Sequence, residues 1–414
     1  MQAVISVPQF ANLNDAEALI RPICGVPLLQ RTLTTAQRFG ASDLLLIWPL
    51  DMPLDLDEAF LRLPLVRKTG KLTIVHASFN PLDSSSWTNL QDCLENQFMW
   101  LPWNWVTNTR TLSDLPSCGR SLQTFSLPSW ISKSEVVPAV TLQPKSGPLP
   151  KGIAVTSDET AGAAERLLVA GSGKLLDGVH TSFNRRLCRP FVRLLSHTPV
   201  TPNQVTLGGV LVSILSFLTF AHGTYWSYVA GALLFFIAGL FDEMDGMLAR
   251  IKFADSPFGT WFEGIADGLS YLMLFGGITL GLHRQYGRWP LIAGAALLAG
   301  TLLALAMTSL GRKLATSPSR PNEYLGRFYQ MLDKDSSNWV SRVVRRVEAF
   351  QRRGVLIHYV VIFTVLGGVP VLFSLATLGS HLAWTLSIYF NHRFFRRPLQ
   401  IAAREGSSTI PEAI

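Results

Sequence analysis

The stretch that decides the fold reads Asp242-Glu243-Met244-Asp245-Gly246-Met247-Leu248-Ala249-Arg250, and Gly259, Glu263 and Asp267 follow it. Residues three and four apart share a face of a helix, so the two aspartates of this stretch lie on one stripe with its glycine and its alanine, and the arginine lies at the edge. The three residues that follow are four apart, which predicts a second stripe on the next helix. Between the stripes, residues 251–258 contain Asp, Ser and Pro, which predicts a turn. The sequence therefore predicts an antiparallel helix pair that points four carboxylates into one small volume.

These carboxylates predict a metal site. They would repel one another unless a cation held them together. Because every candidate ligand is an oxygen and no His or Cys lies nearby, we expect Mg²⁺ or Mn²⁺ rather than zinc. Gly246 and Gly259 have no side chain, so a ligand could lie against the backbone there, and Arg250 offers a planar fork of donors that suits a phosphate. Together these parts predict a nucleotide pyrophosphate bound through a metal ion.

A simpler alternative is that the acidic residues are solvated charges where a membrane helix leaves the bilayer. This alternative accounts for Asp242 and Asp245. It does not account for Asp267, which precedes the apolar run Leu269–Leu282. An ionisable group at that depth is costly and usually functional, so we favour a binding site.

The composition indicates a membrane protein. Charged residues make up 15% of the 414 residues and hydrophobic residues 48%, whereas soluble domains carry about 25% charged residues. The charge deficit is concentrated after Thr201. The net charge of +8 lies largely beside the apolar segments, a pattern that suits anionic lipid headgroups and phosphorylated substrates better than nucleic acid. The cysteines form no Cys-x-x-Cys pair, so we expect reduced thiols in a cytosol-facing protein and no zinc site.

The apolar segments predict a multi-pass, all-α membrane domain over residues 201–397. Thr201 is expected to cap its first helix, with Pro202 in the first helical position. Several segments approach the ~20 residues needed to cross a bilayer, and a weaker last one runs to Phe390, giving about six spans. The positive-inside rule places both termini and the acidic residues in the cytosol. The strong segments are 205–220, 225–241, 264–282, 289–310 and 355–375.

The segments that flank this domain differ from it. Residues 171–200 predict a juxtamembrane helix, because apolar residues recur at helical spacing from Leu175 to Leu195 and arginines fill much of the rest. Such a helix lies on an anionic membrane surface, with Pro190 bending it. The alternative is an ordinary surface helix packed on a soluble domain. Residues 398–414 are expected to form a flexible tail.

Residues 1–170 predict a soluble α/β domain. Apolar runs of strand character surround a helical pattern over Leu28–Phe39, which gives a β-α-β beginning. A second helix is expected over Asp158–Val169, and Leu115–Gly152, rich in Pro, Ser and Gly, is expected to be irregular. The strand-like runs are Ala3–Val7, Leu44–Trp48, Leu72–His76 and Gln97–Leu101.

Two parts of the chain resemble known families. Asp-x-x-Asp-Gly-x-x-Ala-Arg, eight residues, then Gly-x-x-x-Glu-x-x-x-Asp closely resembles the signature of the CDP-alcohol phosphotransferases (CDP-alcohol phosphatidyltransferases), which have Asp where this chain has Glu263. Residues 201–206, Thr-Pro-Asn-Gln-Val-Thr, resemble that family's motif at its first membrane helix, and the likeness covers roughly 174–397. Residues 21–33 resemble the early segment of sugar-phosphate nucleotidyltransferases. Residues 6–20, however, contain no Gly, Lys or Arg to hold a triphosphate, so we expect the fold without the chemistry.

The first resemblance implies a reaction. A phosphoalcohol would pass from a CDP-linked donor, CDP-diacylglycerol or CDP-inositol, to an acceptor hydroxyl such as that of a polyol phosphate, with release of CMP. The layout is similar to that of fused inositol-phosphate cytidylyltransferase and di-inositol-phosphate phosphate synthase enzymes, and we expect a homodimer in the lipid bilayer. The implied metal ligands are Asp242, Asp245, Glu263 and Asp267, with Asp267 also the general base. The implied cytidine and phosphate contacts are Gly246, Ala249, Arg250, Gly259 and Asn203.

Three further interpretations stay open. Glu263 departs from the family pattern, so the chain could be a catalytically impaired pseudoenzyme or lipid-binding scaffold. A cation transporter would also carry intramembrane carboxylates, although such folds usually show paired repeats, and no second acidic motif follows here. Basic residues in 312–327 either grip a phosphorylated acceptor or only set topology; they are Arg312, Lys313, Arg320 and Arg327.

Overall fold

The computed structural model describes residues 1–52, 71–108, 112, 127–133, 151–173, 179–316, 323–335, 338–351 and 353–396. The chain divides into two compact units. The N-terminal unit contains Met1–Ser172, Pro190–Pro199 and Arg250–Phe253. The helical unit contains Gly173–Arg189, Val200–Ala249 and Ala254–Ile414.

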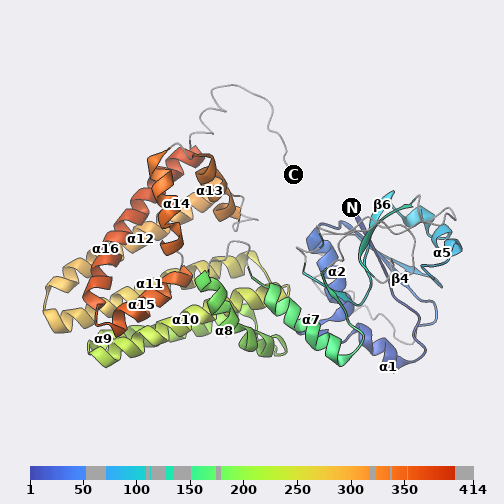
Figure 1. Cartoon of the computed structure of the whole chain (residues 1–414), viewed down its shortest axis with the longest axis horizontal. Helices are drawn as coiled ribbons and strands as arrows, with labels where there is room; N and C mark the ends of the chain where they lie inside the picture. Colours follow the sequence, from blue (N-terminus) through green and yellow to red (C-terminus); the bar gives the residue numbers. More distant parts are fainter. Residues whose placement is uncertain are drawn as a thin grey trace, which may run out of the picture. The chain divides into compact units, whose positions relative to one another are not determined.

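The N-terminal unit is built on a five-stranded sheet in the order β5-β4-β1-β6-β8. Its first four strands in that order are parallel, and β8 pairs antiparallel with β6 at the edge. This sheet, with the helix between its first long strands, confirms the expected α/β fold (Figure 1). The elements are β1 (Gln2–Ser6), α2 (Leu28–Phe39), β4 (Asp43–Trp48), β5 (Lys71–His76), β6 (Gln97–Trp100), β8 (Ser129–Ser132) and α7 (Asp158–Gly171).

Both faces of the sheet are buried. Alternate side chains of a strand point to opposite faces, and in β1 Ala3 and Ile5 enter one core cluster while Val4 enters the other. Leu29 and Leu33 of α2 pack in the first of these clusters. Burial on both faces explains why the parallel strands are continuously apolar instead of alternating.

Strand β8 corrects one prediction. The segment 115–152 was expected to be irregular, yet residues 129–132 pair with β6 along its whole length. Ile131 is buried against the sheet, and this long-range pairing overrides the Pro- and Ser-rich composition around it. Apart from 127–133 and 151–152, this segment lies outside the described residues.

The helical unit confirms the expected all-α part. Among the described residues, four helices are long and apolar enough to cross a membrane, namely Pro202–His222, Pro257–Tyr286, Trp289–Ala315 and Val369–Phe395, and Gly354–Val365 is a shorter apolar helix. The last turns of α8, from Pro190, and the last two residues of α10 belong to the N-terminal unit. The described helices after residue 173 are α8 (Val179–Ser196), α9 (Pro202–His222), α10 (Tyr225–Ile251), α11 (Pro257–Tyr286), α12 (Trp289–Ala315), α13 (Glu323–Lys334), α14 (Trp339–Gln351), α15 (Arg353–Val365) and α16 (Val369–Phe390), with a π-helical turn at Asn391–Arg396.

Local signals explain where two of these helices begin. Thr201 caps α9 as expected: its hydroxyl accepts from the Gln204 amide, and the Gln204 side chain bonds back to the Thr201 amide. Such a cap is worth about 1 kcal/mol. At α11, Ser256 accepts from the Gly259 amide, and Pro257 occupies the first turn. The turn between α10 and α11 is therefore shorter than the predicted 251–258.

The fifth predicted span, 355–375, is broken in the structure. Helix α15 ends at Val365 and α16 starts at Val369. Gly367 has φ +72°, a left-handed conformation that glycine adopts readily, and Pro370 lies in the first turn of α16. The apolar run is thus shared by two helices.

Close helix contacts hold the helical unit together (Figure 1). Helix α9 packs along α11, and α12 packs along α16. At Gly277 of α11, an added Cβ would lie 2.7 Å from the Phe217 carbonyl oxygen, so only glycine allows this approach. Ser213 and Ser270 form a buried hydrogen bond of 3.0 Å between the same helices. Small residues and interhelical hydrogen bonds of this kind hold membrane helices together.

Candidate functional site

Helices α10 and α11 bring three of the predicted acidic residues together. Asp242, Asp245 and Glu263 each offer a carboxylate oxygen, and these oxygens lie within 4.8 Å of one another. Asp245 is only 3% exposed. We call these three residues the acidic cluster. Their meeting follows from the helical spacing in the sequence, because each helix turns one stripe toward the other.

The buried carboxylate of Asp245 tests whether the cluster suits a cation. Its Oδ2 accepts a 2.5 Å hydrogen bond from the Thr206 hydroxyl. Its Oδ1 is buried and has no hydrogen-bond partner among the described groups. An unpaired carboxylate oxygen out of water is costly unless a cation or a proton compensates it. The oxygen-only donor set and this unpaired oxygen both fit a divalent metal ion such as Mg²⁺ or Mn²⁺.

Asp267 lies beside the acidic cluster at a small cavity. Asp242 and Asp245 line the same cavity, so the fourth predicted acidic residue shares their surroundings. Thr206, which was predicted only as part of the motif at 201–206, also lines this cavity. The full lining is Thr206, Gly209, Val210, Ala238, Asp242, Asp245, Ala266, Asp267 and Ser270.

Glu243 is acidic and adjacent to the cluster in sequence but belongs to a different contact. Its Oε2 lies 2.9 Å from Nε of Arg185 on α8, and this pair is largely buried. Glu243 sits one position away from Asp242, about 100° around the helix, so it serves the packing of α8 on α10.

Four of the five predicted nucleotide contacts lie in the helical unit, and the fifth, Arg250, does not. A Cβ added at Gly259 would lie 3.4 Å from Oδ1 of Asn203, so the starts of α9 and α11 meet at these residues. Gly246 and Ala249 follow the cluster along α10. Arg250 is grouped with the N-terminal unit, where its Nε donates to the Ser172 carbonyl at 2.5 Å. A nucleotide-binding role for these residues stays a prediction.

Comparison with known proteins identifies the domain that carries the cluster. Residues 199–332 match the family model for CDP-alcohol phosphatidyltransferases. A phosphatidylinositol phosphate synthase of Corynebacterium glutamicum is 29% identical over 126 residues, 30% of this chain and 53% of that protein. Cholinephosphotransferase 1 of Gallus gallus is 31% identical over 106 residues, 22% of this chain and 32% of its own.

A third relative has two activities in its name. The bifunctional IPC transferase and DIPP synthase of Aquifex aeolicus is 24% identical over 189 residues, 46% of this chain and 38% of that protein. This fused arrangement is similar to the predicted layout. The chain spans between 32% and 53% of the length of these three relatives.

The matched range begins just before α9 and ends in α13, so it contains the whole acidic cluster. Members of the matched family transfer phosphate-containing groups, and metal dependence is typical of them. The apolar helices and this family match together identify the chain as an integral membrane protein. The CDP-alcohol phosphatidyltransferase family model therefore matches the part of the chain that carries the acidic cluster.

Proposed function

We propose that this chain is a metal-dependent CDP-alcohol phosphotransferase, which moves a phosphoalcohol from a CDP-linked donor to an acceptor hydroxyl and releases CMP. The observation that carries the proposal is the acidic cluster with its buried, unpaired Asp245 oxygen, inside the family-matched range. A scaffold without activity has less support, because Glu263 joins the cluster despite its extra methylene.

In this proposal, Asp242, Asp245 and Glu263 hold the metal, with Asp267 completing the set. A bound divalent ion would neutralise the pyrophosphate of the donor and stabilise CMP as it leaves. Asp267 accepts the proton of the acceptor hydroxyl. The acceptor oxygen then bonds to the phosphorus that carries the alcohol, and the bond from that phosphorus to CMP breaks.

The donor cradle is proposed to be the face of α10 after the cluster together with the start of α11. Gly246 and Gly259 let the nucleotide approach the backbone. Arg250 offers donors to a phosphate, Ala249 leaves room beside it, and Asn203 closes the pocket from α9, consistent with its closeness to Gly259.

Arg312 is the best placed of the basic residues proposed to bind a phosphorylated acceptor. Its Nη1 would lie 3.7 Å from a Cβ at Gly264, the residue after Glu263. Arg327 instead donates to the carbonyl of Ala315 at the end of α12, at 2.7 Å. That bond is typical of a helix cap. Arg320 lies outside the described residues.

We also propose the donor, the metal ion, the assembly and the side of the membrane on which the site lies. A relative from Pseudomonas fluorescens is named CDP-diacylglycerol–glycerol-3-phosphate 3-phosphatidyltransferase, which supports CDP-diacylglycerol as the donor. The alternative donor, CDP-inositol, rests on the layout that this chain has in common with the bifunctional relative. We propose Mg²⁺ or Mn²⁺ as the ion, a homodimer as the assembly, and a cytosolic site with both termini on the same side. The N-terminal domain, residues 1–170, would keep a nucleotidyltransferase-like fold without its chemistry, joined through 171–200 to the membrane domain at 201–397.

One experiment tests the function directly. Purified protein in lipid nanodiscs is incubated with Mg²⁺ or Mn²⁺, each CDP-linked donor, and a panel of free and phosphorylated polyols. We expect CMP release and a product whose mass equals acceptor plus phosphoalcohol, lost in Asp242→Asn. No product with any donor in the presence of either metal would contradict the proposal and favour a scaffold.

A further inference from the structure

The four residues from Arg250 to Phe253 are all held by the N-terminal unit. Lys252 Nζ donates to the Thr198 carbonyl at 2.6 Å, and Arg250 Nε donates to the Ser172 carbonyl. The Ile251 carbonyl accepts from Nη2 of Arg31 at 3.0 Å. These residues are the last two of α10 and the first two of the connection to α11, and we call them the linker clamp.

Phe253 is the most constrained residue of the linker clamp. Its φ is +56°, a left-handed conformation that is a strained one for a bulky aromatic residue. Two guanidinium groups lie over its ring, that of Arg31 at 5.0 Å and that of Arg38 at 4.8 Å from the ring centre. Such cation–π contacts stabilise an arrangement that local preferences oppose.

Arg31 reaches the linker clamp from the middle of α2. It is 1% exposed, and its Nε and Nη2 donate to the Ile23 carbonyl at 3.1 and 2.7 Å. Burial lowers the pKa of Arg31 to about 10, so the group stays charged at neutral pH. A buried charge persists only where partners satisfy it, and here two carbonyls from distant parts of the chain do so.

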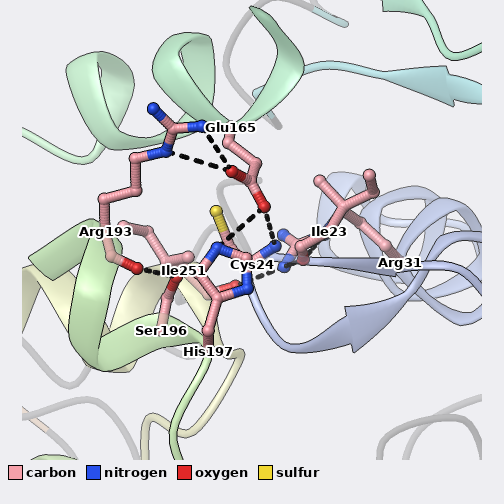
Figure 2. Close-up of polar contacts among 8 residues, drawn as sticks. All are labelled: Ile23, Cys24, Arg31, Glu165, Arg193, Ser196, His197 and Ile251. Atoms are coloured by element: carbon pink, nitrogen blue, oxygen red, sulfur yellow. Dashed lines mark hydrogen bonds and ion pairs between the residues drawn. The ribbon is translucent and has the colours of Figure 1, made fainter. Parts of the chain in front are cut away.

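Glu165 fixes the turn that presents Ile23 to Arg31 (Figure 2). From α7, its Oε1 accepts from the Cys24 amide at 3.2 Å and lies 3.0 Å from Nε2 of His197, and its Oε2 pairs with Arg193 at 3.0 Å. The carboxylate is largely buried. Burial also raises the pKa of the Cys24 thiol, so this cysteine is a packing residue and not a thiolate.

We propose that the N-terminal unit positions the acidic cluster for catalysis, with Arg31 and Glu165 as positioning residues. The proposal rests on the proposed transferase function. Helix α10 ends at Ile251 and α11 begins at Pro257, so the end of α10 and the five residues after it set how the Asp242 and Asp245 stripe meets Glu263. Clamping them restricts the two helices to one register, and small misplacements of catalytic groups are costly to rate. Both positioning residues lie before the family-matched range, so the family match does not assign this role.

The test uses the full-length protein in nanodiscs and the variant Arg31→Met, which keeps much of the side-chain volume and loses the donors. Hydrogen exchange is read in peptides covering 250–258, with Mn²⁺ affinity and CMP release measured on the same samples. We expect exchange there to rise about tenfold or more, from loss of charged hydrogen bonds. We also expect weaker Mn²⁺ binding and a lower kcat with little change in donor KM.

The matched control is Gln2→Leu, which removes a buried polar side chain of the same unit. Gln2 is 2% exposed and donates to the Cys93 carbonyl at 2.8 Å, and none of its hydrogen bonds reaches the linker clamp. Gln2→Leu should lower the unfolding temperature without raising exchange in 250–258. A merely structural role for Arg31 would make the two variants alike.

Two outcomes overturn the proposal: unchanged exchange in 250–258, or raised exchange with wild-type Mn²⁺ affinity and kcat. If Arg31→Met does not fold, Phe253→Leu decides, because it removes the ring contacts and keeps an apolar side chain. Failure of the proposed function is recognised separately, because the wild-type protein would then release no CMP. Hydrogen exchange in 250–258 and Mn²⁺ affinity would still show whether Arg31 holds the linker clamp.

Discussion

The hydroxyl of Thr206 lies 2.5 Å from Oδ2 of Asp245 and donates a hydrogen bond to it. Helix α9 thereby supports a carboxylate that α10 contributes to the acidic cluster. Because one oxygen is held, the other is presented in a fixed direction. Thr206 thus supports a proposed metal ligand. Its described hydrogen bonds go to Asp245 and to the Pro202 carbonyl, and to no other member of the cluster.

Removing this support should weaken the metal site. In Thr206→Val, we expect Mn²⁺ affinity and CMP release to fall about 10- to 100-fold, the usual effect of losing a hydrogen bond to a metal ligand. Thr219→Val is the matched control, because Thr219 is half-buried on the same helix and its described hydrogen bond stays within that helix, to the Leu215 carbonyl. Equal Mn²⁺ titrations for the two variants would contradict the role of Thr206.

The aspartates of the cluster should be essential. Asp242→Asn and Asp245→Asn keep the side-chain volume and remove the charge, so we expect a folded membrane protein without measurable CMP release. Excess chelator should have the same effect on the wild-type protein. Asp333→Asn, which breaks an exposed ion pair with Arg345 at 3.1 Å, should be near wild type. Full activity of either cluster variant would remove the metal assignment.

Glu263 should tolerate the family's usual residue. Glu263→Asp is expected to keep or raise activity and to alter the Mg²⁺/Mn²⁺ preference, because carboxylate reach sets coordination geometry. Rates are compared at saturating concentrations of each metal. Undiminished turnover in Glu263→Gln would show that this side chain is not a ligand.

Arg312 should act on the acceptor. For a phosphorylated acceptor, we expect Arg312→Ala to raise the acceptor KM about tenfold or more, from loss of a charged hydrogen bond. The donor KM should change little. Arg345→Ala is the control, because Arg345 is exposed and paired with Asp333. An acceptor KM equal to that of the wild type would favour a role in topology alone.

One ion pair predicts a dependence of stability on pH. Nε and Nη2 of Arg393 donate to the two oxygens of Asp335 at 2.9 and 2.8 Å, and these bonds lower the pKa of Asp335 to about 2. The unfolded value is about 3.9, so the stabilisation is complete above that pH and is lost as pH falls toward 2. Asp335→Asn should lower the unfolding temperature at pH 6, and the gap to wild type should close in scans toward pH 2.5. A constant gap would contradict the pair.

Local patterns predicted the parts of the structure that depend on neighbours in sequence. The spacing of Asp242, Asp245 and Glu263 was enough to place them together, because helical periodicity is rigid. The boundaries of α2 and the cap at Thr201 followed from apolar spacing and capping chemistry. The break at Gly367 was missed because the apolar residues continue through it.

Contacts between residues far apart in the sequence could not be predicted from local patterns. Arg31 lies in a segment whose resemblance indicated a nucleotidyltransferase fold, and its partner Ile251 is 220 positions away. Strand β8 was likewise not predictable from its own sequence, because this strand is defined by its pairing with β6. Neither contact leaves a periodic signal, because each depends on how separate segments meet.

The inclusion of Arg250–Phe253 in the N-terminal unit has a consequence for synthesis. A ribosome makes Arg31 and Glu165 early, but Phe253 emerges only after α9 and nearly all of α10. The N-terminal unit therefore cannot reach its final packing until α9 and nearly all of α10 have left the ribosome. Nascent chains stalled before residue 250 should hold this unit in a protease-sensitive state, and chains stalled well beyond residue 260 should protect it.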